Sequence, residues 1–171
     1  MVKIIGLIII LFSCSKIGID ASRRYKSRSR EIRSLITALE LMKSEISFTN
    51  SVVSDVLASS SSVSSYSVKE MLGSISDSVA NGNMTAYEAY KKYIRENSWH
   101  FSLKKSELEI LDVFFSKFGM YAPDDQIACI DSALKAMELN LKDAVSDERK
   151  YARLSAVTGI ASGFLIAVIF I

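Results

Sequence analysis

Residues 28–46 read RSREIRSLITALELMKSEI and carry one apolar stripe. The side chains that form the stripe recur at steps of mostly three and four residues: Ile32, Leu35, Ile36, Leu39, Met42 and Ile46. Side chains at this spacing share one face of an α-helix, so the stripe predicts an amphipathic helix whose apolar face is buried. We expect this helix to extend from about Asp20 to Phe48.

A second apolar stripe lies near the end of the chain and has the same spacing. Its members are Ile127, Ile130, Leu134, Met137 and Leu141. The stripe predicts a second long helix, which we expect to begin at Asp124 and to run unbroken through Tyr151.

Capping patterns between the two stripes indicate shorter helices. Ser67–Glu70 and Thr85–Glu88 both have the form of a capping box, in which a hydroxyl and a glutamate satisfy reciprocal backbone amides. The run Asn81–Asn83 contains a glycine and is expected to end the first of these helices. The serine-rich run Ser59–Ser67 is expected to form a loose connection.

A helix of medium length is expected from Ser102 to Phe118. Gly119 and Pro123 are expected to close it before Asp124 caps the last long helix. No stretch of the chain has the alternation of a convincing strand. The sequence therefore predicts an all-α protein, an antiparallel bundle of about six helices.

The chain has 171 residues, of which 49% are hydrophobic, and the surplus lies at its two ends. Residues 154–171 carry no charge and would span roughly 27 Å as a helix, close to the thickness of a bilayer core. Residues 1–19 contain an apolar run and two lysines. We expect two terminal transmembrane segments, 1–19 and 154–171, on either side of a helical middle domain, 20–153.

A rival interpretation of the first segment is a cleaved signal, with Cys14 as the lipidation site of an exported lipoprotein. The basic residues that follow it argue against export, and a second basic group precedes the last segment. Together they form a basic collar, which we define as Arg23, Arg24, Lys26, Arg28, Arg30, Arg33, Arg149, Lys150 and Arg153. Both groups lie on the side of the middle domain, so we expect a multi-pass protein of the cell membrane with its middle domain in the cytoplasm.

The charge balance excludes a protein that coats nucleic acid. Two of the 21 lysines and arginines precede residue 20, and the other 19 match the 19 acidic residues. His100 is the only histidine, which leaves too few ligands for a zinc site and argues against a catalytic triad. We expect no catalytic residue, no metal and no cofactor. Tyr87, Tyr90 and Tyr93 are expected to pack in the core.

Gly159 and Gly163 form a small-xxx-small pattern in the last segment. This pattern lets two helices approach closely in a membrane. The first segment, a second copy of the chain or another subunit could be the partner.

The chain resembles the stage III sporulation protein AB family in the run 28–46, with its basic entry and its closing Glu45 and Ile46. The resemblance continues through Gly119, Asp125 and Gln126 into the glycine-containing apolar terminus. The chain departs from the family pattern after Ile46, where no proline follows.

The resemblance implies a role in the channel that links the mother cell to the forespore during sporulation. It implies a membrane platform like the cytoplasmic domain of type II secretion and type IV pilus inner-membrane proteins. The partners would be other channel subunits and a secretion-type ATPase, stage III sporulation protein AA, and the chain could form a homo-oligomer.

Overall fold

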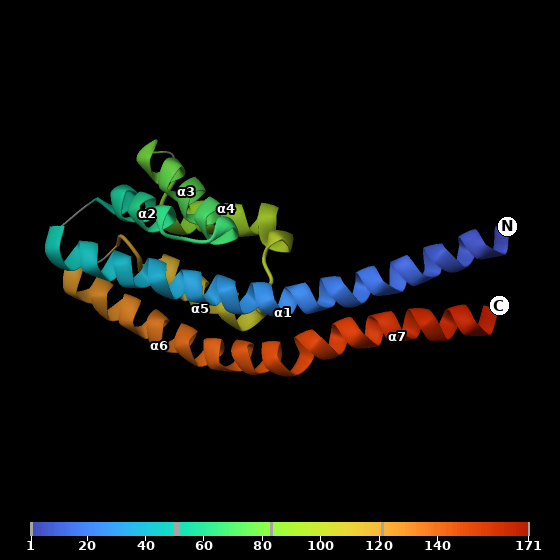
Figure 1. The fold of residues 1–171 in the computed structure, drawn as a ribbon. Coiled ribbons are helices and arrows are strands. Elements are labelled where there is room, and N and C mark those ends of the chain that lie inside the picture. The colour runs from blue at the N-terminus through green and yellow to red at the C-terminus, as the bar shows by residue number, and fades with distance from the viewer. Residues whose placement is uncertain (1, 50–51, 83, 121, 171) are drawn as a thin grey trace. The chain divides into compact units, whose positions relative to one another are not determined.

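The computed structural model describes residues 2–49, 52–82, 84–120 and 122–170 (Figure 1). Its elements in chain order are α1 (Val2–Thr49), α2 (Val53–Ser62), α3 (Tyr66–Ala80), α4 (Ala86–Asn97), the 3-10 turn η1 (Ser98–His100), α5 (Lys105–Lys117), α6 (Pro123–Asp147), the π-helical segment η2 (Glu148–Ala152) and α7 (Arg153–Phe170). No strand occurs in these ranges, so the predicted all-α class is confirmed.

The chain divides into two compact units, which are described separately. The first unit contains residues Met1–Ser29 and Asp143–Ile171, and the second contains Arg30–Lys142. The division by hydropathy and charge into residues 1–19, 20–153 and 154–171 is of another kind and stays a prediction.

The second unit is built on the apolar stripe of α1. Ile32, Leu35, Leu39 and Met42 are each at most 2% exposed, as the spacing of the stripe predicts. Burying each such side chain stabilises the fold by about 1.5–3 kcal/mol. The helix itself starts at Val2, well before Asp20, and is continuous through the first apolar segment.

The serine-rich run forms a connection only at Val63–Ser65, so the prediction of a loose connection was wrong for the helical residues on either side. Its first four residues complete α2, and Ser60 and Ser61 are buried. The Ser61 hydroxyl donates to the carbonyl oxygen of Lys69 over 3.1 Å, and it lies 3.3 Å from the position that a Cβ on Gly73 would occupy. The small side chain of Ser61 therefore lets α2 and α3 pack closely while its hydroxyl bonds to the backbone of α3.

One of the two predicted capping boxes is present. At the start of α4 the Glu88 amide donates to the Thr85 hydroxyl, and the Thr85 amide donates to the Glu88 carboxylate. The bond from the Thr85 amide, and a second one from the Thr85 hydroxyl to the same carboxylate, lower the pKa of Glu88. The prediction of a capping box at Ser67–Glu70 was wrong because α3 begins at Tyr66 and its N-cap residue is Ser65. The amide of Ser65 donates to the Ser34 hydroxyl on α1.

The start of α5 also differs from the prediction. The helix begins at Lys105, and the Glu107 carboxylate accepts the amide of Lys104. The Ser102 amide does not start the helix but donates to the Glu31 carboxylate of α1 over 2.9 Å. This bond fixes the connection between α4 and α5 on α1.

The last long helix begins and continues differently from the expectation. It starts at Pro123, so Asp124 lies in the first turn and is not the N-cap. Proline suits this first position because a backbone N–H there would have no partner within the helix, so its absence in proline costs nothing. The expectation of an unbroken helix through Tyr151 was wrong, because the backbone becomes π-helical between Glu148 and Ala152.

An aromatic cluster joins α4 to α5. Tyr90 is 2% exposed, stacks on Phe115 with ring centroids 4.6 Å apart, and donates its hydroxyl to the Leu108 carbonyl. Burial, with a smaller contribution from Asp112, raises the pKa of the Tyr90 hydroxyl. Tyr87 and Tyr93 are only half-buried, so the tyrosine stripe is core at its central member alone.

Two glycines with positive φ allow a direct test of the packing at the turns. Gly82 has φ +66° with open space around it, whereas at Gly119, with φ +82°, a Cβ would lie 3.0 Å from the Val53 side chain. Gly82→Ala should lower the free energy of unfolding by about 1–2 kcal/mol through backbone strain alone. Gly119→Ala should cost at least about 1 kcal/mol more because the added methyl group overpacks the turn. Urea unfolding of the full chain in detergent, followed by circular dichroism, measures the difference, and equal losses would contradict the contact with Val53.

Candidate functional site

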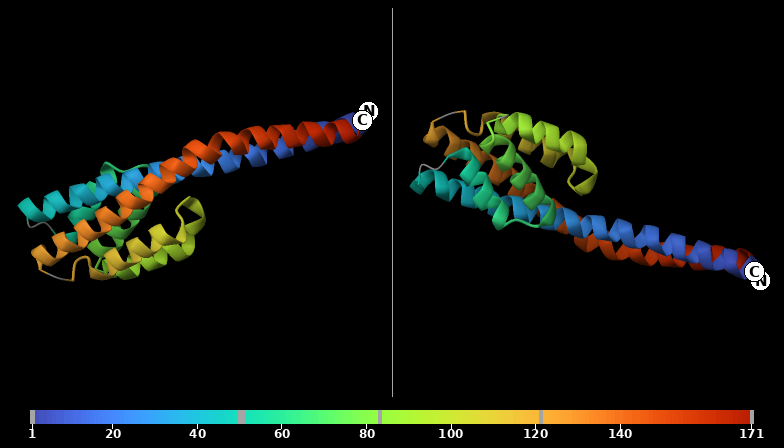
Figure 2. Two further views of the ribbon diagram at one scale, coloured as in Figure 1. Left: turned by 90° about the horizontal axis from the view of Figure 1, so that it is seen from below. Right: turned by 90° about the horizontal axis from the view of Figure 1, so that it is seen from above.

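The candidate site is a pair of helices in the first unit, which we call the terminal helix pair. It comprises residues 2–29 of α1 and residues 143–170, from the end of α6 through η2 and α7. The two chain segments run side by side in opposite directions, so the start of α1 lies next to the end of α7 (Figure 2).

Two glycines bring the backbones of the terminal helix pair into direct contact. A Cβ on Gly18 would lie 2.7 Å from the Ser155 carbonyl oxygen, and a Cβ on Gly159 would lie 2.6 Å from the Gly18 Cα. Real Cβ atoms do not occur at such distances, so only glycine fits at either position. Of the three partners considered for Gly159, the structure shows the first segment. Gly163 lies outside the residues whose surroundings the structure describes.

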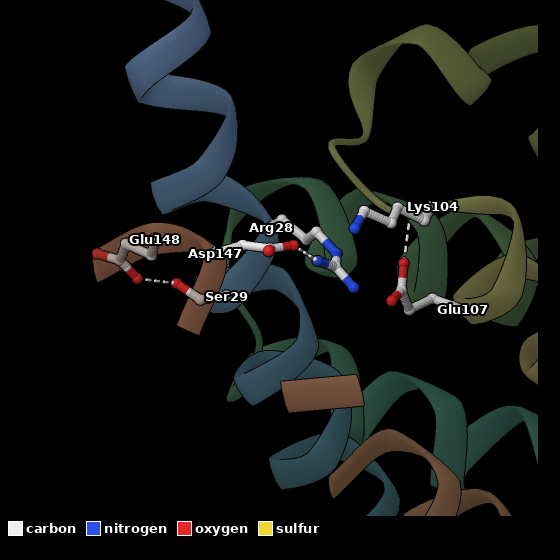
Figure 3. A network of polar contacts seen from close by, with 6 residues as sticks. All are labelled: Arg28, Ser29, Lys104, Glu107, Asp147 and Glu148. Atoms are coloured by element: carbon white, nitrogen blue, oxygen red, sulfur yellow. Dashed lines mark hydrogen bonds and ion pairs between the residues drawn. The ribbon is translucent and has the colours of Figure 1, made fainter. Parts of the chain in front are cut away.

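Polar and aromatic side chains also join the two members of the terminal helix pair. The rings of Tyr25 and Tyr151 stack with centroids 5.8 Å apart. The Arg28 guanidinium donates to the Asp147 carboxylate over 2.9 Å, and the Ser29 hydroxyl donates to the Glu148 carboxylate over 2.5 Å (Figure 3). These contacts occur where α6 gives way to the π-helical segment, which contains Glu148.

The Arg28–Asp147 ion pair is largely removed from water. The Arg28 side chain is 5% exposed and that of Asp147 is 26% exposed. A buried charge is stable only with a partner and hydrogen bonds, so each member of this pair depends on the other. The pair fixes the register of α1 against residues 143–152.

The remaining members of the basic collar are all exposed. Arg23, Arg24 and Lys26 on α1, and Arg149, Lys150 and Arg153 beyond it, belong to the first unit, while Arg30 and Arg33 belong to the second. Arg28 has the same residue type and spacing but lies inside the helix pair. The sequence pattern does not distinguish it, because its partner Asp147 is 119 residues away.

The residues singled out by family pattern lie in the second unit, and two of them meet. The Gly119 amide donates to the Gln126 side-chain oxygen over 3.3 Å, which closes the turn between α5 and α6. Asp125 is exposed in the first turn of α6, and Glu45 is half-buried on α1.

No group of three or more metal-ligating side chains is present among the described residues. His100 is exposed in η1, and Cys129 is half-buried on α6, where burial raises the pKa of its thiol. Within the parts of the chain that the structure describes, no helix combines the length and the apolar character needed to span a bilayer.

No pattern in the sequence indicates Gly18, Asp147 or the π-helical segment. Gly18 stands alone between two isoleucines, and Asp147 precedes a mixed run of charges that resembles any solvated helix face. Helical spacing identifies the buried face of one helix but not which residue of another helix contacts it.

Comparison with known proteins agrees with the resemblance in the sequence. A model of the stage III sporulation protein AB family matches residues 3–171. Stage III sporulation protein AB of Bacillus subtilis (strain 168) is 25% identical over 166 residues, which cover 97% of each chain. A solved structure of stage III sporulation protein AB has a TM-score of 0.66 and 26% identity, over 72% of this chain and 98% of that one. The chain belongs to the stage III sporulation protein AB family.

The glycine contact predicts that a side chain at Gly159 separates the terminal helix pair. Gly159→Leu should move the helices to the ordinary spacing of roughly 8–10 Å between axes. Spin labels at Ile17→Cys and Val157→Cys, on a background without other cysteines, report the change as a longer distance between labels. Ala161→Leu places the same side chain at an exposed position of α7 and should leave the distance unchanged.

The ion pair predicts a large cost for removing one partner. Arg28→Met should lower the free energy of unfolding by about 2–3 kcal/mol, below the 3–5 kcal/mol of a fully buried pair because Asp147 keeps some contact with water. Arg30→Met removes an exposed arginine two residues away and should change the stability by less than about 0.5 kcal/mol. Chemical denaturation compares the two variants. The double variant with Arg28→Met and Asp147→Leu should be more stable than Arg28→Met alone, because no unpaired charge is then buried. Equal effects of Arg28→Met and Arg30→Met on stability would rule out a structural role for the ion pair.

Proposed function

We propose that the chain is a non-enzymatic platform subunit of the channel complex between mother cell and forespore, and that it docks a secretion-type ATPase at the cytoplasmic face of the membrane. The observation that carries the proposal is the match to the stage III sporulation protein AB family along residues 3–171. The ATPase, by the resemblance described above, is stage III sporulation protein AA.

The hydrogen bonds and ion pair of the buried charged side chains support a structural role for the protein. Glu31 and Glu107 are buried carboxylates, and each accepts a backbone amide at the connection between α4 and α5. Arg28 is committed to an ion pair. A general acid or base must face a substrate, whereas these groups hold one part of the chain on another.

The terminal helix pair supports attachment to a membrane through residues 1–19 and 154–171. Ile17, Leu154 and Val157 are each more than half exposed around the glycine contact, as suits a surface covered by lipid. The exposed arginines and lysines of the basic collar suit the anionic headgroups of the cytoplasmic leaflet. An exported lipoprotein modified at Cys14 is the less favoured function, because such a basic cluster resists translocation.

Removal of residues 154–171 tests the platform directly. The truncated chain should keep the helical circular dichroism of the second unit, lose its place in the membrane fraction and fail to support sporulation in a strain without the intact gene. Ala161→Leu in the full-length chain serves as the control and should sporulate normally. Normal sporulation with the truncated chain would refute an anchored platform.

Docking requires a second measurement. The full chain in lipid nanodiscs should bind purified stage III sporulation protein AA, and empty nanodiscs should not. Absence of binding, with the chain shown to be folded in the nanodisc, would refute the proposed partner.

A further inference from the structure

Trp99 is the only tryptophan of the chain, and it is 76% exposed. It lies in η1, the short turn after α4, with its ring against that of His100. A large aromatic side chain that is left in water this fully costs free energy, so its position suggests a surface that is covered in the assembled state.

The structure holds this turn next to one end of the second unit. Three residues after Trp99, the Ser102 amide donates to the Glu31 carboxylate of α1. Glu31 is the second residue of the second unit. The Phe101 ring contacts Tyr93 edge-on and closes the turn onto α4. Trp99 is therefore carried by a connection anchored to α1 where the chain leaves the first unit.

The exposed charged residues around this turn are predominantly basic. On α1, Arg30 and Arg33 lie on either side of Glu31, and Lys104 and Lys105 follow Ser102 at the start of α5. Arg95 lies one turn before Trp99 on α4. All five basic side chains are exposed, while Glu31 and Glu107 are buried against backbone amides. Two of the five have acidic partners, since Glu96 lies 3.9 Å from Arg95 and Glu109 lies 3.5 Å from Lys105, and these two acids offset a part of the charge.

We propose that Trp99 and these basic side chains form a membrane-contact site of the second unit, in which the indole enters the headgroup region of an anionic bilayer. Tryptophan favours this region because its ring is apolar and its N–H can bond to headgroups or water. Lysine and arginine side chains are attracted to an anionic membrane surface. The site rests on the proposed membrane attachment, and it adds a contact made by the second unit itself.

The other exposed aromatic and apolar side chains of the second unit lack this combination. Phe48 is 86% exposed at the far end of α1, about 26 Å along the helix from Glu31. Met120 lies at the turn before α6, whose first turn carries the exposed Asp124 and Asp125. Acidic neighbours are repelled by anionic lipid, so the charges favour Trp99 as the lipid-facing residue.

A single tryptophan makes the site measurable by its own fluorescence. The full chain is reconstituted in vesicles of phosphatidylglycerol and phosphatidylcholine, and flotation shows how much protein is bound. In these vesicles the Trp99 emission should shift to shorter wavelength, be quenched by lipids brominated near the headgroup and lose its quenching by aqueous acrylamide.

An exchange of two aromatic residues provides the control. The variant with Trp99→Phe and Phe48→Trp has the same composition, and its tryptophan should stay accessible to acrylamide and unaffected by brominated lipid. Vesicles of phosphatidylcholine alone should give weaker quenching of Trp99 than anionic vesicles.

The outcomes separate this site from the proposed function. If the chain floats with the vesicles but Trp99 stays accessible to acrylamide and unquenched by brominated lipid, the membrane-contact site is wrong while the platform stands. If purified stage III sporulation protein AA, and not lipid, protects Trp99 from acrylamide, the site is a protein interface and the proposal is likewise overturned. If the chain does not float at all, the attachment and this site fail together.

Discussion

The fold depends on the packing of α1, because other elements of each unit pack against this one helix. In the second unit it receives the amides of Ser65 and Ser102 on its Ser34 hydroxyl and Glu31 carboxylate, and its Lys43 pairs with Asp131 of α6 over 2.7 Å. In the first unit its Gly18 admits the backbone of α7. Since a helix fixes the direction of every side chain along its length, the sequence of α1 specifies where each of the other elements can dock.

Much of the fold could be predicted because helix periodicity and capping are local properties. The stripe that begins at Ile32 and the capping box at Thr85 both depend on residues within a few turns of one another. The starts of α3 and α5 were mispredicted because the deciding hydrogen bonds come from α1, 31 and 71 residues away in sequence. The helical part of the serine-rich run was mispredicted for a related reason. Its Ser61 side chain packs closely on Gly73 of α3 and must therefore be small, whereas the local propensity of serine favours a loop.

The candidate site was predictable in its residue types but not in its pairings. The small-residue pattern at Gly159 indicated a close helix contact, yet nothing in the sequence selects Gly18 as its partner. Arg28 shares its type with its exposed neighbours in the collar, and only the position of Asp147 makes it part of the helix packing. A collar of similar charges thus contains one buried arginine that fixes the helix register among exposed ones that lie at the surface.

Charged residues are divided between the interior and the surface of the protein. This division explains how a middle region without net charge can still have a local excess of basic residues on part of its surface. The 19 basic residues after residue 19 match the 19 acidic residues in number, but Glu31 and Glu107 are buried on backbone amides. A carboxylate that accepts an amide in the interior contributes little to the field at the surface compared with an exposed one. Burial of these two acids therefore leaves Glu96 and Glu109, the partners of Arg95 and Lys105, as the exposed acids paired with basic side chains near Trp99. The same hydrogen bond from Ser102 to Glu31 that fixes the connection thus also shapes the charge of the surface around it.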